Sequence, residues 1–391
     1  MDKIYIGTDV GGSIIKSFTI YNGEERFQDK DNSVLKHDGY VNTSDYVVDE
    51  SDPTTQLDLN VKIVNNPKGQ FKLNVSKLTD EINNNRWLLG TLAKAVSTNS
   101  TKVQLGRGKM RQHQYYLNII GSIVLDMKEN GLKSADVTLG VLLPAKQFFD
   151  LEKEMITELL SSNIEVKNNL TGEIFNIRIR EENIIIKPEA VVAFTSVFIG
   201  KDGKITDLGK TFAPKFNIVI DIGENTTDIA AVRQGKPDPL TFHSFDYAGS
   251  LLMQYFEREI YRKFEGYQPT AEELRSTYSK GTITLGVYEE WVGEEISQAN
   301  EEFARRLFQD FTQIYLLGKD IKLPQIAAFM FIGGGSIKID KVLSVGEHFM
   351  NLVKEECKYV SSFSPDEIRL ANIHGLAEVV RQEKRKQELG R

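Results

Sequence analysis

Short apolar runs alternate with stretches of helical periodicity along most of the chain. The apolar runs predict buried strands at 3–10, 14–21, 135–145, the start of 182–198, 216–221 and 326–332. Apolar residues at helical spacing predict helices over 112–131, the end of 182–198, 248–264, 270–278, 289–317, 343–358 and 372–388, the first of them amphipathic. Strands interleaved with helices in this way predict an α/β fold.

Residues 28–85 differ from this pattern, because they are polar and rich in asparagine. We expect a partly exposed insert with strand-like runs at 57–64 and 70–76, followed by a strand that turns into a helix at Gly90. Residues 97–113 contain no acid and form either a solvated loop or a contact surface for a partner subunit. Their basic residues before His113 are Lys102, Arg107, Lys109 and Arg111.

Two of the predicted strands end in the same unusual way. The stretch IYIGTDVGGSIIKSFTI, residues 4–20, runs into Asp9 and a glycine-rich turn, and FNIVIDIGENTTDIAAV, residues 216–232, runs into Asp221 and a second tight turn. Each turn is followed by another strand. This long-range echo of strand, aspartate, turn and strand predicts two related domains.

The two turns have the chemistry that a polyphosphate requires. Phosphate oxygens need backbone N–H groups that approach closely, which favours glycine, and Mg²⁺ prefers carboxylate oxygens and water. A D-x-G hairpin is also common without any ligand, so each turn alone is weak support. The first candidate set is Asp9, Gly11, Gly12, Ser13 and Lys16, and the second is Asp221, Gly223, Asn225, Thr226 and Thr227.

A third glycine-rich segment strengthens the nucleotide interpretation. The buried strand 326–332 opens into Gly333, Gly334, Gly335 and Ser336, a setting in which backbone can approach a nucleotide closely. The segment lacks the G-x-G-x-x-G pattern of dinucleotide-binding folds and the G-K-[ST] ending of a P-loop.

Taken in order, the three segments resemble the actin-like ATPase superfamily, and the closest resemblance is to the ParM-type bacterial actins that segregate plasmids. IGTDVGGSIIK is similar to the first phosphate motif, IDIGENTTD to the second and FIGGGSIKI to the adenosine motif. WLLGTLAKA, KPEAVVAF and NIHGLAEVV are similar to further ParM segments. The resemblance implies an actin-like fold with two ribonuclease H-like domains flanking a nucleotide cleft. The first would span 1–188 and 370–391, with the insert at about 28–85, and the second 189–369.

The resemblance also assigns roles to residues. Asp9 and Asp221 would hold Mg²⁺, the two turns and Lys16 would bind the phosphates of ATP, with GTP as the alternative, and Ser336 and Lys338 would border the adenosine. Glu189 would orient the attacking water, and its simpler interpretation is an acid at a helix start. Glu224 and Asn225 depart from the family pattern. We expect Glu224 to face away from the phosphates and Asn225 to suit a left-handed backbone.

Composition limits the remaining choices. The 391 residues suggest about two or three domains, and the formal net charge of −7 disfavours non-specific binding to nucleic acid. The single cysteine, Cys357, excludes an internal disulfide and is expected to be a packing residue. No signal peptide and no membrane-spanning run is recognisable, so we expect a cytoplasmic protein.

The function implied by the resemblance is an ATPase that polymerises head to tail and drives plasmid DNA segregation. Its partners would be further copies of itself and a small DNA-binding adaptor protein on a centromere-like site. The alternatives are a small-molecule kinase or phosphatase of the same superfamily, and a bacterial or archaeal actin with a role in cell shape.

Overall fold

The structure is a computed structural model, and it describes residues 1–391 except 12–13, 38–55, 66, 69, 98–100, 102–107, 145–146, 149–151, 201–203, 354–357, 361–364 and 391. The chain forms two compact units, residues 1–188 with 373–391 (unit 1) and residues 189–372 (unit 2). Both combine a sheet with helices, so the predicted α/β class is confirmed. Of the residues singled out above, Gly12, Ser13, Lys102, Arg107 and Cys357 lie outside the described residues.

Unit 1 is built on a mixed nine-stranded sheet with the order β3-β2-β1-β7-β9-β8-β5-β6-β4. Strand β1 pairs antiparallel with β2 and parallel with β7. The predicted strands 3–10 and 14–21 are confirmed as β1 and β2. The strands are β1 Asp2–Val10, β2 Ile14–Tyr21, β3 Glu24–Asp31, β4 Val34–His37, β5 Gln56–Val64, β6 Arg86–Gly90, β7 Ser134–Leu143, β8 Asn163–Asn168 and β9 Ile174–Pro188.

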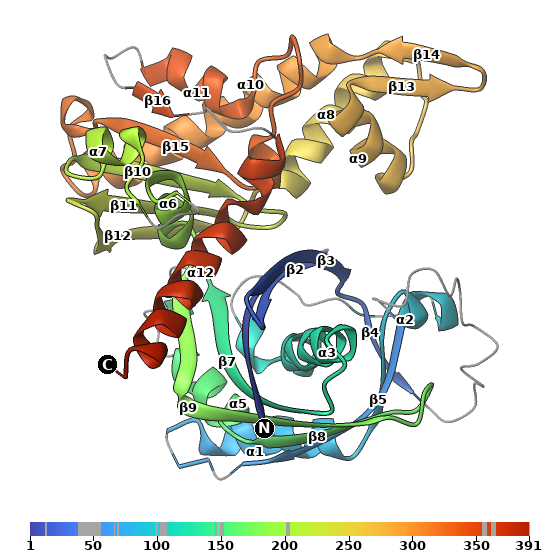
Figure 1. The fold of residues 1–391 in the computed structure, drawn as a ribbon. Helices are drawn as coiled ribbons and strands as arrows, with labels where there is room; N and C mark the ends of the chain where they lie inside the picture. Colours follow the sequence, from blue (N-terminus) through green and yellow to red (C-terminus); the bar gives the residue numbers. More distant parts are fainter. Residues whose placement is uncertain are drawn as a thin grey trace. The chain divides into compact units, whose positions relative to one another are not determined.

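The sheet of unit 1 curls around helix α3, His113–Glu129 (Figure 1). Every residue from Tyr115 to Met127 is buried, so the prediction of an amphipathic helix is wrong in its pattern although right in its position. A helix enclosed by a sheet has no solvent-facing side to keep polar. The other helices of this unit are α1 Lys72–Asn83, α2 Thr91–Val96, α5 Glu152–Leu160 and, from Ile373 onward, α12 Pro365–Glu388.

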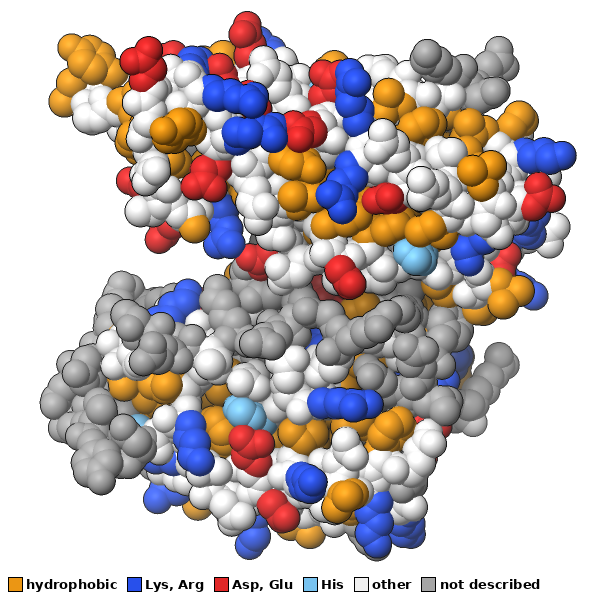
Figure 2. Space-filling view, turned by 180° about the vertical axis from the view of Figure 1, so that it is seen from behind, with side chains coloured by type: hydrophobic (Ala, Val, Ile, Leu, Met, Phe, Trp, Pro, Cys, Tyr) orange, Lys and Arg blue, Asp and Glu red, His pale blue; other side chains and the backbone are white. Residues whose placement is uncertain are grey.

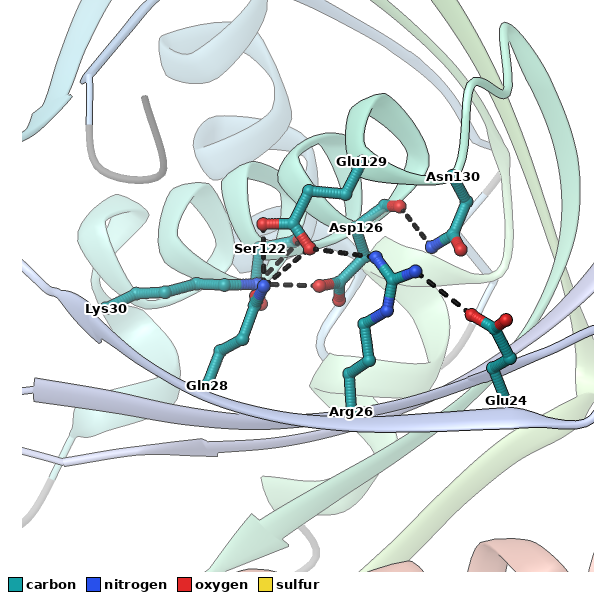
Figure 3. Close-up of polar contacts among 8 residues, drawn as sticks. All are labelled: Glu24, Arg26, Gln28, Lys30, Ser122, Asp126, Glu129 and Asn130. Carbon is teal, nitrogen blue, oxygen red and sulfur yellow. Dashed lines mark hydrogen bonds and ion pairs between the residues drawn. The ribbon is translucent and has the colours of Figure 1, made fainter. Parts of the chain in front are cut away.

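Polar side chains join strand β3 to α3. Alternate residues of β3 reach towards the helix, and the fully buried Lys30 binds Asp126 Oδ1 at 2.9 Å and Ser122 Oγ at 3.1 Å (Figure 3). Further out, Gln28 donates to both oxygens of Glu129. A buried ion pair is costly to break, because the remaining charge would stay desolvated. The contact therefore fixes β3 just before Asp31 and Asn32.

The described residues of 28–85 contribute the end of β3 and all of β4, β5 and α1 to unit 1. The predicted strand at 57–64 is confirmed as part of β5, whose first four residues are all buried and whose remaining residues alternate between exposed and buried. The predicted strand at 70–76 is wrong, because Lys72–Asn83 is helix α1. Val75, Leu78 and Ile82 bury one face of it at the spacing of a helix.

Unit 2 is built on a five-stranded sheet with the order β12-β11-β10-β15-β16. Its strands are β10 Phe216–Ile222, β11 Thr227–Arg233, β12 Lys236–Phe245, β15 Ala328–Ile332 and β16 Lys358–Val360. One face carries α8 Gly249–Lys263, α10 Gly293–Phe311 and α11 Val345–Val353. The other carries α6 Val191–Phe198, α7 Asp207–Phe212 and the residues of α12 up to Asn372.

A small hairpin, β13 Thr282–Leu285 and β14 Tyr288–Trp291, follows helix α9, Ala271–Lys280. The prediction of a helix starting at 289 is therefore wrong at its beginning, because residues 289–291 are strand and α10 starts at Gly293. Gly281 and Gly286 adopt positive φ angles of 74° and 66°, which turn the chain on both sides of β13. From Phe311 the helix continues as a π-helical segment, Thr312–Leu317.

The repeated pattern of strand, aspartate, turn and strand is also present in the two sheets. In unit 1 the order β3-β2-β1-β7 places an aspartate turn between β1 and β2, and in unit 2 the order β12-β11-β10-β15 places one between β10 and β11. In both, the first strand pairs antiparallel with the second and parallel with a strand far along the chain. The two units share this core arrangement.

Candidate nucleotide-binding site

The first turn joins β1 to β2 at the end of a buried strand. Asp9 is 7% exposed and stands directly opposite Lys16 across the two strands, with 4.0 Å between Asp9 Oδ2 and Lys16 Nζ. The amide of Gly11 donates to the carbonyl of Ile14 at 3.0 Å and closes the turn. A carboxylate and an ammonium therefore face the same side of the sheet at the turn.

The backbone of this turn is supported by a residue that was not predicted from the sequence. Asn32 follows β3, is fully buried, and donates from Nδ2 to the carbonyl of Gly11 at 2.7 Å. The carbonyl of Asn32 accepts in turn from Nδ2 of Asn118 on α3 at 3.0 Å. Helix α3 and strand β3 thus support the backbone of the first turn. No local pattern could have identified Asn32, because it lies far from Gly11 in sequence.

We expect Asn32→Ala to lower the free energy of unfolding by about 1–3 kcal/mol, because it leaves the half-buried Gly11 carbonyl without this donor. It should also weaken nucleotide binding. Asn83→Ala is the matched control, since Asn83 makes similar bonds to the backbone of Ile63 away from the turn. Urea unfolding and titration with a fluorescent nucleotide check both effects. Equal loss of affinity in the two variants would show that Asn32 has no special role at the turn.

The second turn joins β10 to β11 and is tightly braced. The amide of Gly223 donates to the carbonyl of Thr226 at 3.0 Å. At the start of α8, the amides of Gly249 and Ser250 donate to the carbonyls of Gly223 and Glu224 at 3.0 and 2.8 Å. The conformation of this loop is therefore set before any ligand binds.

Two buried carboxylates face each other beside this turn. Asp221 and Asp228 are cross-strand partners, 5% and 2% exposed. Asn372 Nδ2 donates to Asp221 Oδ2 at 2.7 Å, and Thr226 Oγ1 donates to Asp228 Oδ2 at 3.1 Å. Like charges directly opposite each other destabilise a sheet. A bound cation would remove this repulsion, so Asp228 joins the candidate residues, although it was not among those predicted from the sequence.

The donor set also suits magnesium in particular. Mg²⁺ is usually bound through one or two carboxylates together with waters and substrate phosphates, not by a cage of side chains. Among the described residues, no group of three or more His, Cys, Asp and Glu side chains could hold a metal. Asp221 and Asp228 are the described residues of unit 2 that fit the ion, and Asp9 is the one at the turn of unit 1.

The remaining residues of the second turn have other contacts. Glu224 forms an ion pair with Arg275 of α9 at 2.8 Å. The hydroxyl of the fully buried Thr227 donates to the carbonyl of Tyr247, so it braces the turn. Asn225 is exposed. Asn225 would tolerate a left-handed backbone, but it does not adopt one, because it is not among the described residues with positive φ.

The glycine-rich segment after β15 packs against the second turn. A Cβ atom on Gly333 would lie 2.4 Å from Asp221 Oδ1 and 2.5 Å from the carbonyl oxygen of Ile222, and the φ of Gly333 is 84°. Gly335 is packed against the side chain of Ile222, whereas Gly334 has open space around it. Ser336 is 2% exposed and donates to the carbonyl of Ile332, which closes the segment on its own strand. These contacts place the triple glycine against Asp221. Lys338 is exposed and pairs with Glu347 of α11 at 2.6 Å.

Gly333→Ala should lower the free energy of unfolding by about 2–5 kcal/mol, since it combines a left-handed backbone with a backbone clash. Gly334→Ala is the matched control and should change the unfolding free energy by well under about 1 kcal/mol. Both values come from urea denaturation. A similar loss in the two variants would contradict the close packing described for Gly333.

Glu189 stands at a strained point of the backbone. It lies half-buried between β9 and α6, and the Val191 amide donates to its carbonyl across a three-residue turn. The central residue of this turn, Ala190, is fully buried with φ 44° and ψ −49°. A positive φ is rare outside glycine, and such strain is concentrated at functional sites. Glu189 therefore directly precedes a strained residue at the start of α6.

Comparisons with known proteins agree with this arrangement. Residues 219–345 match the family model described as the C-terminal part of archaeal MreB-like actin homologues. The archaeal actin homolog Ta0583 is similar in structure with a TM-score of 0.68 at 17% identity, covering 97% of this chain and 99% of that one. The chain has an actin-like fold. Among curated proteins, no sequence matches it.

Two ParM structures share the actin-like fold with this chain. ParM from Bacillus thuringiensis with ATP gives a TM-score of 0.65 at 13% identity, covering 98% of this chain and 100% of that one. ParM from a 15-stranded filament of Clostridium botulinum gives 0.61 at 14% identity, with coverage of 98% and 100%. The resemblance to actin-like proteins inferred from the three motifs is confirmed at the level of the fold.

In this actin-like chain each unit carries one turn of the candidate site. Unit 1 holds Asp9, Gly11 and Lys16, and unit 2 holds the second turn, the triple glycine and Glu189. No helix among the described residues is long and apolar enough to cross a membrane.

Proposed function

We propose that this actin-like protein binds ATP with Mg²⁺ through the turns of both units, hydrolyses it, and polymerises head to tail in the cytoplasm to separate plasmid copies. The observation that carries the proposal is the buried pair Asp221 and Asp228 at the second turn. Two carboxylates that face each other beside a glycine turn destabilise the fold through charge repulsion, and a bound cation removes this repulsion.

Each group of residues has its own role in the proposed site. The amides of the two turns and the ammonium of Lys16 bind phosphate oxygens, and Asp9 and Asp221 hold the ion. When bound, Mg²⁺ neutralises the charge that develops on the transferred phosphoryl group. Glu189 orients the attacking water and accepts its proton. Ser336 and Lys338 border the adenosine.

The assembly and its biological role rest on similarity. The similar ParM structures were obtained with ATP in one case and from a filament in another. We propose the same two properties for this chain, with a small DNA-binding adaptor on a centromere-like site as its partner. The formal net charge of −7 supports an adaptor over direct binding to DNA.

Phosphate release from ATP and from GTP, each with Mg²⁺ or with EDTA, tests the catalytic part. We expect release from ATP that depends on Mg²⁺ and rises steeply with protein concentration as polymers form. Turnover that persists in EDTA, or that requires a sugar or another small acceptor, would contradict the proposal and favour a kinase.

A further inference from the structure

Helix α12 carries an asparagine that contacts the candidate cation site directly. Asn372 Nδ2 donates to Asp221 Oδ2 at 2.7 Å, although the two residues are 151 positions apart in the sequence. Asparagine is among the weaker helix formers, because its amide competes for backbone hydrogen bonds. Here the amide reaches out of its helix to the end of strand β10, so helix formation does not account for it.

The charge of Asp221 depends on such neighbours. On the face seen in Figure 2, acidic and basic side chains are interspersed at the surface, where water solvates them. Asp221 is only 5% exposed. A buried carboxylate must obtain its stabilisation from hydrogen bonds and cations nearby. Asn372 supplies one of these hydrogen bonds.

The backbone around Asn372 is held on both sides. Ala371 is buried and packs in the apolar cluster of unit 2 that contains Ile332 of β15. Ile373 is buried as well, and α12 passes from unit 2 to unit 1 between Asn372 and Ile373. Two closely packed neighbours leave the residue between them little freedom to move. Nδ2 is therefore in place beside Asp221 before any ligand binds.

The chemistry of the two partners determines which way the amide points. A carboxylate only accepts hydrogen bonds, so Asn372 presents Nδ2 to Asp221 and directs Oδ1 elsewhere. Oδ1 is buried, and no group of the described residues donates to it. A buried acceptor that lacks a donor is costly. The amide oxygen thus calls for a donor close to the carboxylate that is proposed to hold the ion.

A hydrated cation brings donors of this kind. Mg²⁺ keeps several of its waters when a protein binds it through one or two carboxylates, and those waters donate hydrogen bonds. Partners outside the direct ligands orient the ligands, and losing one typically weakens metal binding about 10–100-fold. An amide that holds a ligand with its N–H group and accepts from a metal-bound water with its oxygen fits this role.

We propose that Asn372 is a positioning residue of the cation site, with Nδ2 holding the Asp221 carboxylate and Oδ1 accepting from a water on the ion. The two contacts need a donor and an acceptor, and an amide offers both. This inference rests on the cation part of the proposed function. It predicts that residue 372 affects the binding of the ion far more than the binding of nucleotide without metal.

Mn²⁺ binding tests this role without turnover, because Mn²⁺ takes the same oxygen ligands and is detected by electron paramagnetic resonance. The full chain is titrated in the presence of a non-hydrolysable ATP analogue. Asn372→Leu keeps the size of the side chain and removes both polar groups, so it should raise the dissociation constant for Mn²⁺ about 10–100-fold. Its affinity for fluorescent ATP in EDTA should change by less than about threefold, since no ion is present.

Asn372→Asp separates the role in ion binding from a purely structural one. It keeps an oxygen acceptor and adds a charge that attracts the ion, so it should bind Mn²⁺ at least as tightly as the unaltered chain. In EDTA the new carboxylate faces Asp221 and should make the variant easier to unfold in urea. A residue that only supports the fold would instead lose Mn²⁺ affinity and stability together in both variants.

Asn217→Leu is the matched control. Asn217 is also a buried amide, and its Nδ2 donates to the carbonyls of Phe212 and Lys215 at the other end of β10 from Asp221. The substitution should lower stability and leave Mn²⁺ affinity unchanged. Unchanged Mn²⁺ affinity in Asn372→Leu, or a loss in Asn372→Asp, would overturn the role of Asn372 alone. If the unaltered chain binds no Mn²⁺ with the ATP analogue, the cation part of the proposed function fails instead.

Discussion

Asp221→Asn should lower ATP turnover by at least about a hundredfold, the scale expected when a group that organises charge at a phosphoryl transfer site is removed. The asparagine keeps the size of the side chain and can still accept the hydrogen bond from Asn372. It also ends the repulsion between the carboxylates at 221 and 228. We therefore expect the variant to be as stable as the unaltered chain, or more stable.

Phosphate release and urea unfolding, measured on the same preparation, separate these two effects. Asp228→Asn should also reduce turnover, and by a smaller factor, because Asp228 faces Asp221 but is not one of the two proposed ligands of the ion. Asp238→Asn, on β12 away from the turn, is the control that should keep full activity. Full turnover by Asp221→Asn would show that Asp221 is not part of the catalytic site. A large loss of stability in this variant would show that the two carboxylates serve to stabilise the fold.

Glu189→Gln should reduce kcat by about 10²–10⁴, the usual contribution of a positioned acid or base. Nucleotide affinity should change by less than about threefold, because the water is not part of the bound nucleotide. Single-turnover phosphate release and nucleotide titration measure the two quantities. Glu182→Gln, which changes an exposed acid on β9, is the control.

The backbone at Ala190 offers an independent check on Glu189. Ala190→Gly should remove the strain of the positive φ and leave the fold stable, while the added backbone freedom beside Glu189 should lower kcat. Unchanged kcat in both Glu189→Gln and Ala190→Gly would mean that the acid is an ordinary helix-start residue.

The parts of the fold that depend on local pattern could be predicted from the sequence. Apolar runs placed β1, β2, β10 and β15, and an aspartate at the end of a strand marked both turns. The cross-strand pair was also within reach, since Asp228 follows Thr227 in the second motif and antiparallel pairing must bring it opposite Asp221.

The errors arise where distant segments decide the outcome. Burial of α3 on all sides follows from a sheet that curls around it, which its own sequence does not show. The hairpin at 282–291 lies between two helices, and its residues 289–291 fall within the predicted helix 289–317 because the short strands show no clear alternation. Asn32 supports Gly11 only because β3 returns beside β2 and α3 packs below it.

Right-angle light scattering on adding ATP, ADP or no nucleotide, followed by parallel phosphate release, tests the central claim most directly. The account predicts that scattering rises with ATP and Mg²⁺, that phosphate release follows it, and that scattering decays once the ATP is consumed. It also predicts that Asp221→Asn shows no such cycle. Constant scattering in all three conditions, with a chain that remains monomeric, would contradict it.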